Sequence, residues 1–124
     1  MLNLQAAAQE IPTVDDATTT TRALAALRGR LPPRSVAEWA RLVGVSRAHL
    51  SRCVQRETGR PVGGHLRERR LQRARDLLEG ADHRMDYVAW ESGFRNVAAL
   101  DHAFTRAFGC APTRWRQRHR QVVA

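Results

Sequence analysis

Two stretches of this sequence share one pattern. Residues 40–54 read ARLVGVSRAHLSRCV, and residues 89–104 read AWESGFRNVAALDHAF. In each, a glycine stands four positions after an alanine. A helix-capping residue comes next, followed by two apolar residues that are four positions apart. Alanine lets two helices approach closely, and glycine accepts the positive φ of a tight turn. The pattern predicts a helix, a sharp turn and a second helix, which is a helix-turn-helix unit.

The two copies are offset by 49 to 50 residues, and a long helical pattern joins them. One copy alone is a weak signal because many helix pairs turn at a glycine, but two linked copies are specific. No stretch alternates as a strand does, so the predicted fold class is all-α. The predicted divisions are a flexible acidic tail or linker remnant (1–20), a first helix-turn-helix subdomain (21–60), a linker helix (61–80), a second subdomain (81–120) and a C-terminal end (121–124).

Capping residues and apolar spacing place the individual helices. Ser35 with Glu38 forms a capping box, and Ser46 and Asn96 are suitable N-caps for the second helix of each unit. A short amphipathic helix ahead of them is predicted from Leu24, Ala25, Leu27 and Leu31. The linker helix, about 62–79, is predicted to turn inward Leu66, Leu71, Ala74, Leu77 and Leu78. A last short helix opens at Pro112 and carries Trp115.

The charge is uneven along the chain. All 21 basic residues are arginines and lie in residues 22–124, which also hold nine of the 12 acidic residues and so carry a net charge of +12. A small domain with that excess repels itself unless a polyanion is near, which favours nucleic acid as the partner. The alternative is a solvated basic surface that has no polyanionic partner.

Several classes of function are not supported. Cys53 and Cys110 lie far apart and have no zinc-site spacing, so we expect two small buried apolar residues, no metal and no cofactor. No paired carboxylates, catalytic triad or phosphate-binding glycine loop indicates an enzyme. There is no apolar run of about 20 residues and no signal peptide, so a cytoplasmic location without membrane contact is expected.

Helical periodicity separates inner and outer faces of the two second helices. On the helix from Ser46, Leu50, Cys53 and Val54 face the core; on the helix from Asn96, the inward residues are Leu100, Ala103, Phe104 and Ala107. The opposite faces carry the predicted base-reading residues. These are Ala48, Ser51, Arg52 and Gln55 on the first helix, and Val97, Ala98, Asp101, His102 and Thr105 on the second.

Each outward side chain has a chemical interpretation on DNA. Arg52 suits guanine O6 and N7, and Gln55 suits adenine. Asp101 either accepts from a cytosine amino group or repels phosphates, and the alternative for Asp101 and His102 is a plain solvated surface. The predicted phosphate contacts are Ser46, Arg47, Arg56, Arg95, Asn96, Arg106, Thr113, Arg114 and Arg116.

Residues 24–118 resemble the AraC/XylS family of bacterial transcription regulators. The resemblance rests on 46–52 (SRAHLSR), 57–59 (ETG), 66–71 (LRERRL), and on Gly93-Phe94, Ala103-Phe104, Phe108-Gly109, Pro112 and Trp115-Arg116. It implies a seven-helix domain that binds double-stranded DNA as a monomer, with two recognition helices (about 46–58 and 96–108) in successive major grooves. It also implies RNA polymerase as a partner. Most members carry a separate ligand-sensing domain, for which this chain has no room, so no small-molecule site is expected.

The chain departs from the family pattern at Leu100, Asp101 and His102, where members commonly have an aromatic, a small hydroxyl and a basic residue. The second recognition helix is therefore predicted to bind weakly or to read an unusual sequence. Only about 20 residues precede the first predicted helix, so the chain is either a stand-alone regulator or the remnant of a longer one. A protein-interaction module with a decayed DNA face is the main competing hypothesis, and RNA binding is a more distant one.

Overall fold

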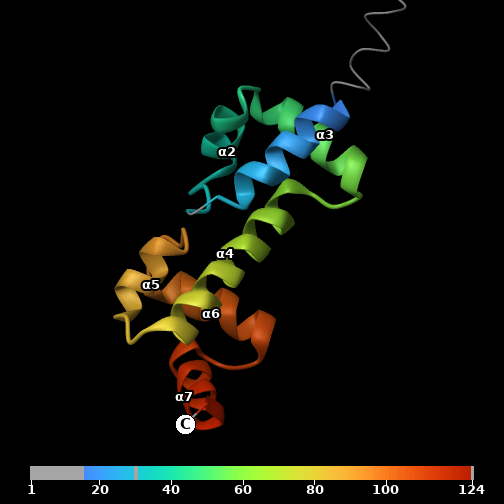
Figure 1. Cartoon of the computed structure of the whole chain (residues 1–124). Helices are drawn as coiled ribbons and strands as arrows, with labels where there is room; N and C mark the ends of the chain where they lie inside the picture. The colour runs from blue at the N-terminus through green and yellow to red at the C-terminus, as the bar shows by residue number, and fades with distance from the viewer. Residues whose placement is uncertain (1–15, 30, 124) are drawn as a thin grey trace, which may run out of the picture.

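The computed structural model describes residues 16–29 and 31–123, and every regular element within them is a helix. Figure 1 shows the helices arranged along one long central helix, α4. The predicted all-α class with seven helices is confirmed. A helix over residues 16–27 is followed by α2 (Val36–Val43), α3 (Arg47–Thr58), α4 (Val62–Gly80), α5 (Met85–Glu91), α6 (Val97–Phe108) and α7 (Pro112–Val123).

The predicted caps start the helices of both helix-turn-helix units. The Ser35 hydroxyl accepts a hydrogen bond from the Glu38 amide at 3.0 Å, and the Ser46 and Asn96 side chains cap α3 and α6 in the same way. The capping box closes one residue early, because the Glu38 carboxylate accepts from the Arg34 amide at 3.1 Å rather than from that of Ser35. The first turn of α2 is thus tied to the chain that precedes it.

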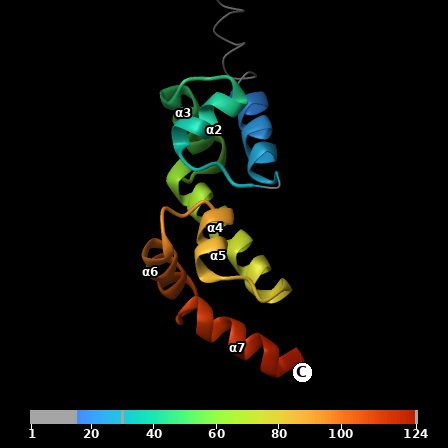
Figure 2. The same cartoon turned by 90° about the vertical axis from the view of Figure 1, so that its left-hand side faces the viewer.

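Two separate hydrophobic cores are built on α4. The first gathers the helix over 16–27, α2, α3 and Leu66, and the second gathers α5, α6 and the four buried residues Leu71, Ala74, Leu77 and Leu78. All five inward residues predicted for the linker helix are therefore buried. Figure 2 shows the two units at opposite ends of α4. The linker helix therefore contributes to both cores.

The last helix packs through an aromatic cluster. The Trp115 ring lies 5.8 Å from that of Phe104 and 5.2 Å from that of Phe108, measured between centroids. The Trp115 indole also donates a hydrogen bond of 3.2 Å to the Glu79 carboxylate on α4. Helix α7 continues to Val123 and so includes residues 121–123 of the predicted C-terminal end.

The predicted tail is wrong for residues 16–20, which are helical, while residues 1–15 lie outside the described residues. Asp16, Thr19 and Thr20 are buried. One hydrogen bond attaches this helix to α2: the Trp39 indole donates to the Ala23 carbonyl at 2.9 Å. Tertiary packing therefore overrides the low helix propensity of the threonine run. Leu31 lies beyond this helix and is 48% exposed, and Ala25 is also exposed, contrary to prediction.

A junction of four residues connects the two units across α4. The Arg70 guanidinium on α4 donates to the backbone carbonyls of Pro33 and Arg34, which precede α2. The Arg34 guanidinium in turn stacks on the Trp90 ring of α5, with its Cζ 3.5 Å from the ring centroid. Burial lowers the pKa of Arg70 from its ordinary value. Since each partner belongs to a different unit or to the linker, the junction restricts how one unit turns against the other.

Gly93, in the turn before α6, is enclosed by this junction. Its φ is +88°, and a Cβ atom there would lie 3.2 Å from Arg70 Nε and 3.5 Å from the Pro33 carbonyl oxygen. Gly44, in the equivalent turn of the first unit, has a φ of +86° but nothing within 4 Å of such a Cβ. The two turns therefore have the same backbone conformation and different surroundings.

Gly93→Ala should destabilise the chain more than Gly44→Ala does. The positive φ costs both variants about 1–2 kcal/mol, and displacement of Arg70 adds roughly 1 kcal/mol at Gly93 alone. Chemical denaturation of both variants measures the difference in free energy of unfolding. Equal losses would show that the contact with Arg70 does not constrain the turn.

Candidate nucleic-acid interface

Helix α3 presents the outward face that its periodicity predicts. Leu50, Cys53 and Val54 are buried in or beside the first core. Of the predicted base-reading residues, Ala48, Arg52 and Gln55 are exposed and Ser51 is half-buried. The Arg52 guanidinium lies 3.3 Å from Nδ1 of His49, one turn back along the same helix.

Helix α6 presents the same face fifty residues later. Ala98, Asp101, His102 and Thr105 are exposed, at positions equivalent to Ala48, Ser51, Arg52 and Gln55 of α3. Val97 differs from the other predicted base-reading residues, because it is half-buried and packs against the second core. Leu100 and Phe104 are buried and Ala103 packs beside them, as predicted. Ala107, one residue before the end of α6, is exposed rather than inward.

Most of the predicted phosphate contacts lie on the surface. Ser46 and Asn96 use their side-chain oxygens as caps, which leaves their helix starts to offer backbone amides. Four arginines and one threonine are exposed and have no ion pair within the described part of the chain. They are Arg47, Arg95, Arg106, Thr113 and Arg114.

Arg116 points inward. Its side chain is only 14% exposed, donates a hydrogen bond to the His83 carbonyl and lies 3.5 Å from the Asp82 carboxylate. It therefore joins α7 to the loop between α4 and α5 and has little surface left for a phosphate. Its neighbour Arg118 is exposed.

Arg116→Ala should lower the free energy of unfolding by about 1–3 kcal/mol, since a charged donor buried against a carbonyl is removed. Arg118→Ala on the same helix should leave stability unchanged. Thermal melts of both variants test this assignment. A stable Arg116→Ala protein whose DNA affinity has lost part of its salt dependence would instead identify Arg116 as a phosphate contact.

Behind α3 lies a polar group that the sequence did not reveal. Asp16 is only 5% exposed; its carboxylate accepts from the Cys53 thiol at 3.1 Å and pairs with Arg56 at 2.8 Å. Burial, then the hydrogen bond and charge of Asp16, raise the pKa of Cys53 to about 11. Arg56, a predicted phosphate contact, is thus already paired. His49 and Cys53 stand four residues apart in the sequence, but nothing there indicated Asp16.

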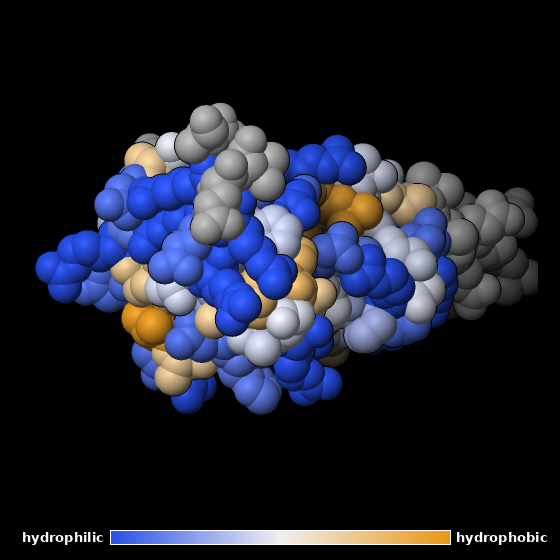
Figure 3. Space-filling model, turned by 90° about the horizontal axis from the view of Figure 1, so that it is seen from below, coloured by the Kyte–Doolittle hydropathy of each residue, from blue (hydrophilic) through white to orange (hydrophobic). Residues whose placement is uncertain are grey.

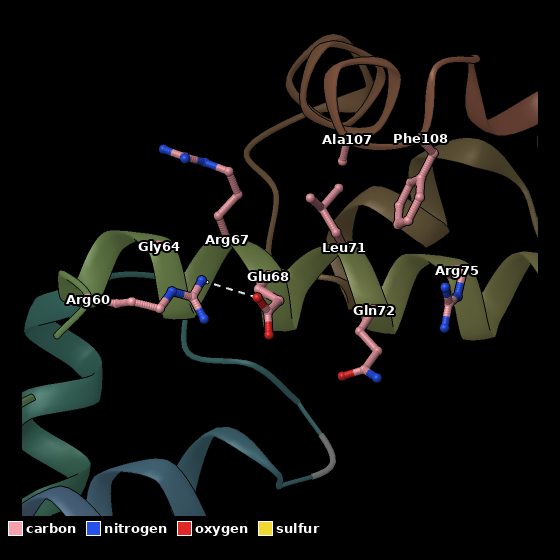
Figure 4. A pocket seen from close by; sticks show the side chains of 9 residues that line it. All are labelled: Arg60, Gly64, Arg67, Glu68, Leu71, Gln72, Arg75, Ala107 and Phe108. Atoms are coloured by element: carbon pink, nitrogen blue, oxygen red, sulfur yellow. Dashed lines mark hydrogen bonds and ion pairs between the residues drawn. The ribbon is translucent and has the colours of Figure 1, made fainter. Parts of the chain in front are cut away.

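A hollow on α4 lies between the C-terminal ends of α3 and α6. Figure 4 shows Leu71 and Phe108 on one side of it and polar side chains along α4. An ion pair of 3.1 Å joins Arg60 and Glu68 across one end of the hollow, and the Arg75 guanidinium lies 5.8 Å from the centre of the Phe108 ring.

Figure 3 shows that the face seen from the α7 end is mainly hydrophilic. Within residues 16–29 and 31–123, no helix is long and apolar enough to cross a bilayer.

A family profile described as a helix-turn-helix domain matches residues 39–118, the part of the chain that holds both units. Sequence relatives include the transcriptional activator RhaR of Yersinia pseudotuberculosis, 35% identical over 69 residues, and the transcriptional regulator GlxA of Rhizobium meliloti, 37% identical over 79 residues. A solved AraC-type DNA-binding protein from Chromobacterium violaceum has a TM-score of 0.69 at 25% identity and covers 82% of this chain and 92% of its own. The chain belongs to the AraC/XylS family.

The AraC/XylS fold has also been solved with DNA. The DNA-binding domain of the transcriptional factor AdpA, in complex with a target DNA, has a TM-score of 0.66 at 30% identity and covers 86% of this chain and 93% of that domain. The matched stretches cover 56% of this chain for RhaR and 64% for GlxA. The chain spans about a quarter of the length of these curated relatives, 24% in both cases.

Proposed function

We propose that this AraC/XylS chain binds specific sequences of double-stranded DNA through α3 and α6 and regulates transcription. The observation that carries the proposal is the exposure of equivalent positions on two recognition helices joined by one linker helix. The net charge of +12 over residues 22–124 supports a polyanionic partner. The AdpA domain, which was solved on its target DNA, has the same fold.

The first recognition helix carries the stronger base-reading chemistry. Arg52 pairs with guanine through two donors, Gln55 pairs with adenine, and Ser51 and Ala48 allow the helix to approach the groove closely. On α6, Asp101 accepts from a cytosine amino group, and His102 and Thr105 read or support a neighbouring position. The second half-site is therefore weaker and differs in sequence from the first.

Phosphate contacts set the register. Arg47 and Arg95 stand beside the starts of α3 and α6, where backbone amides also point outward, and Arg106, Thr113 and Arg114 extend this set over the second unit. Both units lie on one chain, so a monomer binds two half-sites about one helical turn, or roughly 34 Å, apart. RNA polymerase is the proposed protein partner, and the DNA-bound protein is associated with the nucleoid.

Selection of binding sites from a random duplex library should yield a bipartite sequence. We expect two short elements about one helical turn apart, with the element read by α3 more strongly enriched. A single element would limit α6 to backbone contacts. If binding is salt-sensitive but no sequence is enriched, the competing hypothesis of a decayed DNA face, which the acidic Asp101 on α6 favours, is correct.

Arg52→Ala should cost roughly 1–3 kcal/mol of binding free energy and relax the preference at one base pair. Arg47→Ala is the matched control, because a lost phosphate contact weakens binding to all sequences and reduces the salt slope by about 0.9. Affinities for the selected site and its single-base variants, measured at two salt concentrations, separate the two effects. An unchanged base preference in Arg52→Ala would mean that α3 does not enter the groove by this face.

A further inference from the structure

Three side chains that bind transition metals converge behind the first recognition helix. Asp16 comes from the helix over 16–27, and His49 and Cys53 come from successive turns of α3. One ligand atom from each lies within 4.8 Å of the others. Asp16 and Cys53 are buried and His49 is half-buried, so the group is covered by protein yet open on the imidazole side.

The spacing of these atoms fits a tetrahedral metal. The Cys53 sulfur lies 3.6 Å from Nε2 of His49 and 3.1 Å from Oδ1 of Asp16. A tetrahedral zinc ion with ordinary bond lengths holds sulfur and nitrogen ligands about 3.5 Å apart. The sulfur–nitrogen distance already matches this spacing, and the Asp16 oxygen, which lies within 4.8 Å of the other two atoms, completes the group when its side chain turns toward the ion. A ligand set of sulfur, nitrogen and oxygen favours zinc over magnesium or calcium, which prefer oxygen.

We propose that Asp16, His49 and Cys53 form a zinc site in which the fourth position is taken by water. On binding, the Cys53 thiol gives its proton to solvent and the sulfur bonds to the metal as a thiolate. Asp16 exchanges the hydrogen bond from that thiol for a bond to zinc. His49 binds through Nε2 and carries its proton on Nδ1. This assignment revises the expectation, drawn from cysteine spacing, that the chain has no metal site.

Two arginines contact the proposed ligands and supply the positive charge beside them. Arg56 pairs with the Asp16 carboxylate at 2.8 Å, and the Arg52 guanidinium lies 3.3 Å from Nδ1 of His49. Zinc replaces Arg56 as the counter-charge of Asp16. A protonated Nδ1 no longer accepts a hydrogen bond from Arg52. Metal binding therefore releases both arginines from the cluster.

The released arginines belong to the proposed DNA face, so zinc should strengthen DNA binding. This coupling rests on the proposed function, whereas the metal site itself does not. Because coupling between two ligands is reciprocal, DNA that draws Arg56 to a phosphate also raises the affinity for zinc. We expect zinc to tighten binding by roughly five- to tenfold, within the usual range of coupling between sites.

Cobalt spectroscopy on the full chain tests the metal site directly. The protein is stripped of metal under reducing conditions and titrated with Co²⁺, and zinc is then added in competition. Tetrahedral d–d bands with a thiolate charge-transfer band should appear and be removed by zinc. Cys53→Ser should abolish the charge-transfer band and His49→Gln should weaken the complex, while Cys110→Ser, the matched control at the other cysteine, should leave the spectrum intact.

Circular dichroism of each variant separates loss of metal binding from loss of folding. A folded wild-type chain without the charge-transfer band would overturn the proposal, as would a band that survives Cys53→Ser. In either case the group is an anchor that attaches the helix over 16–27 to α3 through Arg56 and Cys53.

The coupling is tested with a fluorescent mixed-sequence duplex at fixed low salt, with and without zinc. Tighter binding that requires Cys53 supports it, and equal affinities in a chain shown to hold zinc contradict it. A chain that binds no DNA at either zinc level would overturn the coupling together with the proposed function. The cobalt spectrum would still decide whether the site exists.

Discussion

The arginine junction on α4 is the constraint on which the arrangement of the two units depends. Arg70 reaches from the linker helix to the carbonyls before α2, and Arg34 at that point stacks on Trp90 of α5. Each core packs on its own stretch of α4, so what the cores leave free is bending and twisting of that helix between Leu66 and Leu71. The junction supplies cross-contacts between the two units, and Gly93 allows it because any side chain there would press on Arg70. A fixed angle between the units is what two-site reading of a rigid duplex requires.

The two reading faces share geometry but not chemistry. Arg52 and Gln55 on α3 are long donors suited to purines, whereas the equivalent positions on α6 carry His102 and Thr105 beside the acidic Asp101. Such a pair suits a protein in which one unit supplies most of the specificity and the other fixes the register. The group of Asp16 packs against α3, so any change there acts on the helix to which we assign the stronger base-reading side chains.

Periodicity predicted the helices and their inner faces because burial repeats with the turn of a helix, as at Leu50 and Val54 or at Leu100 and Phe104. It did not predict which arginine turns inward. Arg116 and Arg118 are alike in sequence, but only Arg116 meets a free carbonyl from a distant loop. Asp16 was hidden for a similar reason, since its partners on α3 lie 37 and 40 residues away. The local sequence pattern determines which face of a helix is buried, whereas long-range hydrogen bonds determine what an individual polar side chain does.

In the proposed function, α3 and α6 act on DNA as one rigid unit. This rigidity is tested most directly by the affinity of the chain for duplexes that carry both half-sites with the spacing between them changed one base pair at a time. Rigid coupling predicts one sharp optimum near a single helical turn, and loss of that sharpness in Trp90→Ala, which removes the stacking partner of Arg34. Equal affinity across several spacings in the unaltered chain would contradict it, because the units would then bind as independent modules on a flexible linker.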